Sequence, residues 1–325
     1  MLRYSARPLQ ALTLVSTLAL APLAQAAEVV ASIKPLQLIT AALTEGVTRP
    51  EVLLPAESSP HHYALKPSDM RKLTDADLVI WVGPGLEQFM VRPLARTDAQ
   101  IVTLRPDLEP HRHEEIGPDH VDEHEHEHEH EHDRDHDEAD AHADGHHDHT
   151  AENDPHIWLD PINGLDIARQ ILPALQEAMP EHADQLQQNY ENFVLALKQK
   201  EKRIAEELAP VKDAGFFVFH DAYTGFVGHY GLNQLGYFTV DPGRKPGARH
   251  LADIRQQLQD AKAVCVFSEP QFTSAVVDAI TSGLPVHQGE LDPLARSIEV
   301  NAEGYLNYLQ ELSDSFRACL AKKTD

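Results

Sequence analysis

The sequence predicts an α/β fold of two lobes, each a mostly parallel sheet covered by helices, with one long rigid helix joining them. In both halves of the chain, short apolar strands alternate with helical patterns, which is typical of parallel sheets with helices on both faces. Residues 181–209 form one apolar stripe at helical spacing, about 43 Å long as a helix. We interpret this helix as a strut between lobes; an amphipathic helix on one surface is the alternative. Both halves also contain Leu-Asp-Pro, at 159–161 and 291–293.

The first lobe is expected to occupy residues 27–180. Pro67 opens one of its helices, with Ser68 or Asp69 placed to cap it, and the apolar strand 78–82 stops at a Gly-Pro-Gly turn. The expected strands are 28–33, 51–54, 78–82 and 101–104, and the expected helices are 36–43, one opening at Pro67, 86–94 and 162–179.

The second lobe is expected at 210–325, after the linking helix 181–209. Its first strand, 216–219, is continuously apolar and leads directly into His220. Further strands are expected at 237–240, 263–267 and 284–287, and helices at 250–262, 272–282 and 301–322.

The first 26 residues have the pattern of an export signal. Arg3 and Arg7 precede an apolar core at 11–23, and Ala24-Gln25-Ala26 is a cleavage site of the A-x-A type. The core is too short to span a membrane, and no cysteine near the cleavage site offers a lipid anchor. We therefore expect a soluble exported protein, periplasmic in a bacterium, without direct membrane insertion.

Residues 111–153 form a segment rich in His, Asp and Glu, without apolar periodicity. Between 111 and 149, sixteen acidic residues face Arg112 and Arg134, so this stretch carries about −14 of the formal net charge of −25. Such a composition does not repay the entropy of ordering, and predicts a disordered loop. The charge repels nucleic acid and anionic lipid and favours cationic partners.

Two cysteines, Cys265 and Cys319, lie far apart in the sequence. In an oxidising compartment an isolated pair predicts a disulfide. A thiolate metal site is the alternative, but neither cysteine belongs to a C-x-x-C motif.

Three histidines are candidates for a shared metal site. Ligands of open α/β sheets bind beyond the carboxyl ends of the strands, where His61, His156 and His220 can all lie. Asp292 follows the last short strand and can lie there too. Three imidazoles and one carboxylate suit tetrahedral zinc better than magnesium, calcium or manganese, while copper and nickel also accept such ligands. His182, His229, His250 and His287 lack this support, and we expect ordinary surface or core roles for them.

Three motifs resemble the metal-binding components of bacterial ABC importers. They are Pro-His-His-Tyr-Ala-Leu-Lys-Pro-Ser-Asp at 60–69, Asp-Pro-His-Ile-Trp-Leu-Asp-Pro at 154–161 and Phe-His-Asp-Ala-Tyr at 219–223. The sequence is most similar to the ZnuA type of the TroA-like group, over essentially the whole mature chain, including the acidic loop and the cysteine pair. The resemblance implies two α/β lobes joined by one long helix, with zinc in the cleft. It implies His61, His156 and His220 as ligands, with Asp292 at a fourth position that ligates in some relatives.

The fourth ligand is open at this stage, because some relatives carry a ligating Glu where this sequence has Pro60. Either Asp292 or water completes the site, and we favour water or a loosely held Asp292. His62 is a rival to His61, but the motif position favours His61. Glu269, at a strand end, is a candidate for orienting a ligating histidine; a capping or surface carboxylate is the alternative.

The acidic loop is expected to bind several zinc ions weakly near neutral pH, since neutral imidazole is the ligating form. Tethered to the cleft, it would raise the local metal concentration; a solvated linker is the plainer alternative. Its regularly spaced histidines are His124, His126, His128, His130 and His132.

The resemblance implies a monomeric periplasmic solute-binding protein, not an enzyme, that delivers Zn²⁺ to an inner-membrane ABC permease with a cytoplasmic ATPase. One alternative is a zinc hydrolase or lyase, because three histidines and a water form a catalytic pattern, although no H-E-x-x-H motif supplies a base. A manganese-importer component or an adhesin on the same fold is the other.

Overall fold

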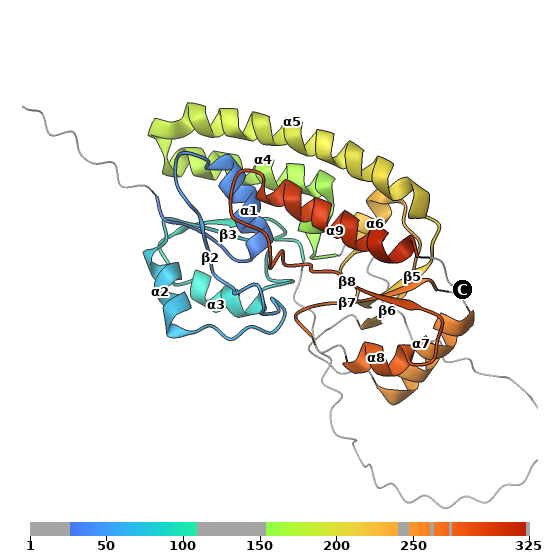
Figure 1. Cartoon of the computed structure of the whole chain (residues 1–325). Coiled ribbons are helices and arrows are strands. Elements are labelled where there is room, and N and C mark those ends of the chain that lie inside the picture. Colours follow the sequence, from blue (N-terminus) through green and yellow to red (C-terminus); the bar gives the residue numbers. More distant parts are fainter. Residues whose placement is uncertain (1–26, 109–153, 240–246, 261–262, 273–274, 323–325) are drawn as a thin grey trace, which may run out of the picture.

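The computed structural model describes residues 27–108, 154–239, 247–260, 263–272 and 275–322. The expected signal peptide and acidic loop, with His124, His126, His128, His130 and His132, lie outside the described residues. The described chain forms two lobes, each built on a four-stranded parallel sheet, lying side by side beneath one long helix (Figure 1).

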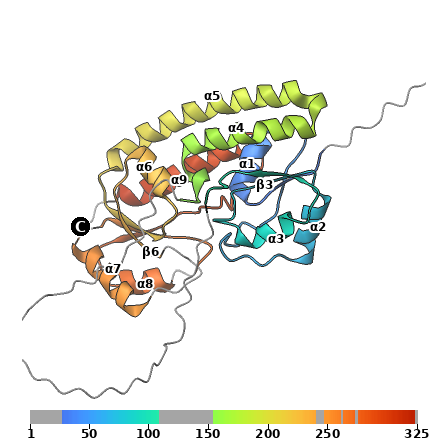
Figure 2. The ribbon, with the colours of Figure 1, turned by 180° about the vertical axis from the view of Figure 1, so that it is seen from behind.

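The first sheet has the strand order β2-β1-β3-β4, and all of its neighbours pair in parallel. Helices α1 and α4 lie on one face, and α2 and the short α3 on the other (Figures 1 and 2). The strands are β1 (Val29–Ala31), β2 (Glu51–Val52), β3 (Leu78–Trp81) and β4 (Gln100–Thr103), and the helices are α1 (Lys34–Leu43), α2 (Pro67–Asp75), α3 (Val91–Leu94) and α4 (Pro161–Ala178).

The second sheet repeats this plan with the order β6-β5-β7-β8, again entirely parallel. The side chains of β5 alternate between two cores. Phe216 and Val218 face the large core, whereas Phe217 and Phe219 face the smaller core beside α7 and α8. The elements are β5 (Phe216–His220), α6 (Thr224–Tyr230), β6 (Gln234–Thr239), α7 (Ala248–Asp260), β7 (Cys265–Ser268), α8 (Ala275–Thr281) and β8 (His287–Glu290). Burial on both faces explains why the first four residues of β5, 216–219, are all apolar.

Two helices extend over both lobes. The long helix α5 (Ala183–Leu208) contacts α1 and α4 of the first lobe and also α9 (Gly304–Leu320). Helix α9 contacts α1 as well as β8, and Figures 1 and 2 both show α5 running above the two sheets. The predicted two-lobed α/β class with a long helix is therefore confirmed. Where one lobe ends and the next begins stays a prediction, since α9 packs against elements of both lobes.

The two cysteines form a disulfide that ties the end of α9 to β7, with a Cα–Cα distance of 6.1 Å between Cys265 and Cys319. Within the described part of the chain, no helix has the length and apolarity needed to cross a membrane.

Two local expectations were wrong, and one helix was not expected. The helix expected at 86–94 is a 3₁₀ turn, Gln88–Met90, followed by the four-residue α3. The last strand of the second sheet lies at His287–Glu290, not at 284–287, because β8 is a half-exposed edge strand and the apolar run before it is a turn. Helix α6 has no counterpart among the expected elements.

Candidate metal centre

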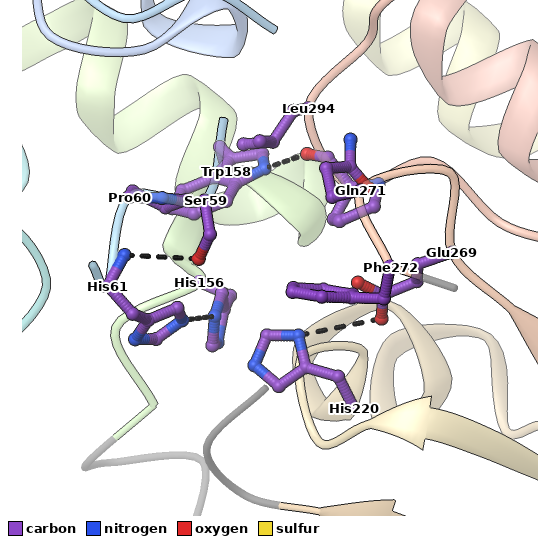
Figure 3. Close-up of a pocket in the computed structure, with 11 residues that line it drawn as sticks. Ser59, Pro60, His61, His156, Trp158, His220, Glu269, Gln271, Phe272 and Leu294 are labelled. Carbon is purple, nitrogen blue, oxygen red and sulfur yellow. Dashed lines mark hydrogen bonds and ion pairs between the residues drawn. The ribbon is translucent and has the colours of Figure 1, made fainter. Parts of the chain in front are cut away.

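The three histidines converge from separate segments of the chain. His61 follows β2, His156 precedes the 3₁₀ turn Ile157–Leu159, and His220 ends β5. One potential ligand atom of each histidine lies within 4.8 Å of the ligand atoms of the other two. Among the described residues, these three histidines form the group that could hold a metal ion. His156 and His220 are 4% and 3% exposed, while His61 is half-buried. Figure 3 shows the three rings facing one another in a pocket between the lobes.

The nitrogens of the first lobe already have a spacing that suits a metal. His61 Nε2 and His156 Nε2 are 3.1 Å apart. Two nitrogens bound to tetrahedral zinc at about 2.0–2.1 Å would be separated by roughly 3.3 Å. The ring centroid of His220 lies 5.2 Å from that of His61 and 4.7 Å from that of His156. A small movement of His220 would bring the three nitrogens onto one ion.

Sheet register places Glu269 beside His220. Strands β5 and β7 are parallel neighbours in which Val218 pairs with Phe267, so the next positions along bring His220 level with Glu269. Glu269 is 3% exposed, and its Oε1 lies 3.5 Å from His220 Nδ1. The neighbouring Tyr223 is fully buried, and its pKa lies well above the ordinary value. Burial is the larger cause, and the negative charge of Glu269 is the second. A buried carboxylate thus lies directly behind the histidine of the second lobe.

A second carboxylate, which the sequence analysis missed, lies behind His156. Asp154 Oδ1 is 2.7 Å from His156 Nδ1 and also accepts a hydrogen bond from the His156 backbone N–H at 2.9 Å. The available signal was the spacing in Asp-Pro-His, which puts a carboxylate within reach of its own i+2 residue.

Asp292 lies outside the group of ligand atoms. Its Oδ1 accepts hydrogen bonds from the Gln271 side chain at 2.7 Å and from the Leu294 backbone at 3.0 Å, and its Oδ2 accepts one from the Arg296 backbone at 2.7 Å. These bonds stabilise the turn after β8. His62 is also outside the group, since its side chain is exposed while His61 faces the pocket.

The walls of the pocket come from both lobes. Trp158 is fully buried, stands edge-on to His156 with a centroid distance of 5.4 Å, and donates its indole N–H to the Pro293 carbonyl at 2.7 Å. Gln271 donates a side-chain hydrogen bond to the Ala56 carbonyl of the first lobe at 3.2 Å. Direct bonds between the lobes therefore fix the distance across the pocket.

Two α/β lobes under a long helix, with three imidazoles meeting between them, define a two-lobed metal-binding protein. The profile of the family described as "ZnuA: Zinc-uptake complex component A periplasmic" matches residues 29–319. The chain belongs to this family.

Curated relatives align with this chain over most of the length of both proteins. A high-affinity zinc uptake system protein ZnuA from Yersinia pestis is 44% identical, with 90% of this chain and 91% of that protein aligned. The protein of that name from Haemophilus influenzae is 39% identical, with 93% of this chain and 95% of that protein aligned.

Solved structures share the fold at lower identity. A crystal structure of ZnuA has a TM-score of 0.68 at 23% identity, covering 90% of this chain and all of that one. A zinc-bound deletion mutant of ZnuA has a TM-score of 0.70 at 23% identity, covering 92% and 100%. The laminin-binding protein Lmb of Streptococcus agalactiae has a TM-score of 0.68 at 18% identity, and the alignment covers 89% of this chain and 99% of that one. At these identities the likeness concerns the fold alone.

Proposed function

We propose that this protein captures one Zn²⁺ ion between its lobes and delivers it to an inner-membrane ABC permease driven by a cytoplasmic ATPase. The observation that carries the proposal is the meeting of three imidazoles, from both lobes, within 4.8 Å. Neutral imidazole prefers zinc to the harder divalent ions. The names of the relatives, high-affinity zinc uptake system proteins, point to the same cargo.

In this proposal His61, His156 and His220 ligate the ion and water fills the fourth position. Asp292 is the weaker candidate because its two oxygens already accept three hydrogen bonds. Releasing them would cost about 0.5–1.5 kcal/mol for each bond. A water ligand fits a carrier, because a site with an exchangeable position gives up its cargo more readily than a closed structural site.

We assign Glu269 the role of orienting His220. Its carboxylate lies 3.5 Å from Nδ1, and contact with it favours Nε2 as the metal-binding nitrogen. Burial of an unpaired carboxylate is costly, so this pair is expected to tighten when the ion draws His220 inward.

The cell compartment and the acidic loop complete the proposal. The signal at 1–26 would direct a monomer to the periplasm, and the histidines of 111–153 would collect zinc at low affinity. This loop is an accessory, because the three cleft histidines all lie outside it.

The alternatives fit less well. A hydrolase would need a base beside a metal-bound water, whereas the carboxylates close to the group, Asp154 and Glu269, both lie against histidine ring nitrogens. A manganese carrier would use more carboxylate. Transport without catalysis is therefore the better proposal.

Calorimetric zinc titration tests the site. Mature protein should bind one ion tightly and several weakly, and deletion of 111–149 should remove the weak sites. His220→Ala should abolish tight binding, while His250→Ala is the matched control because His250 bonds to the Phe238 carbonyl instead. Tight binding that survives His220→Ala but disappears with the loop would overturn the proposal.

A further inference from the structure

The contact between Asp154 and His156 is the most complete polar contact at the centre. One oxygen, Asp154 Oδ1, lies 2.9 Å from the His156 backbone nitrogen and 2.7 Å from Nδ1 of the ring. Asp154 is 5% exposed and His156 4%. Burial of a carboxylate is costly unless it is paired or hydrogen-bonded, and here its partner is a residue of the metal group.

The local chain fixes the position of the ring. Pro155 has its φ locked near −65°, and the carboxylate closes a turn by bonding the backbone of His156. On another side, the Trp158 ring stands edge-on to the imidazole at a centroid distance of 5.4 Å. Rotation of His156 about its side-chain bonds would break the carboxylate contact and the edge contact with the indole.

The same contact selects the tautomer. An ionised carboxylate only accepts hydrogen bonds, so Nδ1 must carry the proton that it shares with Asp154. The lone pair then lies on Nε2, the atom 3.1 Å from His61 Nε2 and directed at the other imidazoles.

We propose that Asp154 is a positioning residue that makes His156 the preformed ligand of the centre, fixed in rotamer and tautomer before zinc arrives. This inference rests on the proposed function. His220 provides the contrast, since neither of its ring nitrogens has a hydrogen-bond partner in the described structure and Glu269 is 3.5 Å away.

Asp160 is a matched control. Its Oδ1 accepts from the backbone N–H of Ile162, two residues on, at 2.8 Å, which is the same local bond that Asp154 makes. The histidine beside Asp160 is His229, at 3.5 Å, which does not belong to the metal group. Asp160→Asn removes the same charge from the same segment without touching a ligand.

The test is zinc affinity, measured by competition with a chelator, in the full chain and in Asp154→Ala, Asp154→Asn and Asp160→Asn. Loss of such a partner weakens metal binding about 10- to 100-fold, and we expect this for Asp154→Ala. Asp154→Asn should lose less zinc affinity than Asp154→Ala. The amide oxygen of Asn must keep accepting the hydrogen bond of the His156 backbone N–H, and it can still accept one from Nδ1. Asp160→Asn should keep the zinc affinity of the unsubstituted protein, because Asp160 touches none of the three ligands.

A second readout is independent of affinity. Imidazole nitrogen NMR of the metal-free protein should show His156 protonated on Nδ1, and Asp154→Ala should mix the tautomers. If Asp154→Ala fails to fold, the spectra of the unsubstituted protein and of Asp154→Asn decide. A metal-free His156 protonated on Nε2, or Asp154→Ala with unchanged affinity, would overturn the inference while leaving the site intact. Tight binding that survives His156→Ala would instead overturn the proposed function.

Discussion

Glu87 is a fully buried carboxylate beyond the carboxyl ends of the inner strands β1 and β3 of the first sheet. It accepts hydrogen bonds from the Ser32 hydroxyl and from the Gly83 backbone at 2.9 Å. Burial raises its pKa from the ordinary 4.5 to about 7, and these hydrogen bonds limit the rise. Between these two values the folded chain binds more protons at this residue than the unfolded chain does. The contribution of Glu87 to stability is therefore fully present below about pH 4.5 and is lost as the pH rises through about 7.

The pH dependence gives a prediction for Glu87→Gln. The loss in the unsubstituted protein amounts to roughly 3 kcal/mol of unfolding free energy. Glutamine does not titrate, and its amide fits against the Ser32 hydroxyl, which also accepts hydrogen bonds. Urea unfolding of both metal-free proteins at pH 5 and pH 8 should show Glu87→Gln gaining relative stability at pH 8. A difference between the two proteins that stays constant with pH would contradict the raised pKa.

At the same scale, the sequence indicated some site residues and not others. His61, His156 and His220 all stand in recognisable motifs, and His220 also directly follows an expected strand. The position of Glu269 depends on the pairing of β5 with β7, which puts it level with His220. The Asp-Pro-His spacing could have predicted the contact of Asp154 with His156, but a single carboxylate beside a proline has many possible partners.

The elements were predicted best where burial is greatest. Strands β3 and β5 are buried throughout and were recognised from continuous apolar runs. Strand β8 and the four-residue α3 are short and partly exposed, so the surrounding structure decides their limits. Helix α6 includes two glycines, Gly225 and Gly228, which weaken the helical pattern. A Cβ at Gly225 would lie 3.1 Å from Asp160 Cβ, so glycine allows α6 to pack closely against the first lobe there.

The disulfide should stabilise the second lobe without affecting the metal centre. It closes a loop with a sequence separation of 54, for which the chain-entropy model gives about 4 kcal/mol as an upper value. Cys265 begins β7 and Glu269 follows its end, so roughly 13 Å of strand separates the bond from the pocket. We expect Cys265→Ala with Cys319→Ala to lower the unfolding free energy by about 2–4 kcal/mol with unchanged zinc affinity. Urea unfolding with and without dithiothreitol checks this, and the double variant is the control because reductant cannot affect it. Equal midpoints for the oxidised and reduced native protein would contradict the prediction.

On the scale of the whole molecule, one continuous core joins the two lobes. A single cluster of buried side chains includes Val29 of the first sheet, Phe216 of the second, Leu197 of α5 and Phe316 of α9. The smaller cluster beneath α7 and α8 adjoins only the second sheet. Since the large core is shared, loss of one lobe would expose apolar surface of the other. The two lobes should therefore unfold together, and movement between them should be small.

Thermal unfolding tests this shared core and its link to zinc. Both tryptophans, Trp81 and Trp158, lie in the first lobe, whereas far-ultraviolet circular dichroism reports helices of both lobes. We expect fluorescence and dichroism to give one coincident transition in metal-free protein lacking 111–149. Because the ligands come from both lobes, zinc at a hundredfold excess over its Kd should add about 2.7 kcal/mol and raise the whole transition together. His220→Ala should keep the coincident transition but lose most of the zinc shift. Two separate transitions, with fluorescence following one of them, would show that the lobes unfold independently despite α5 and α9.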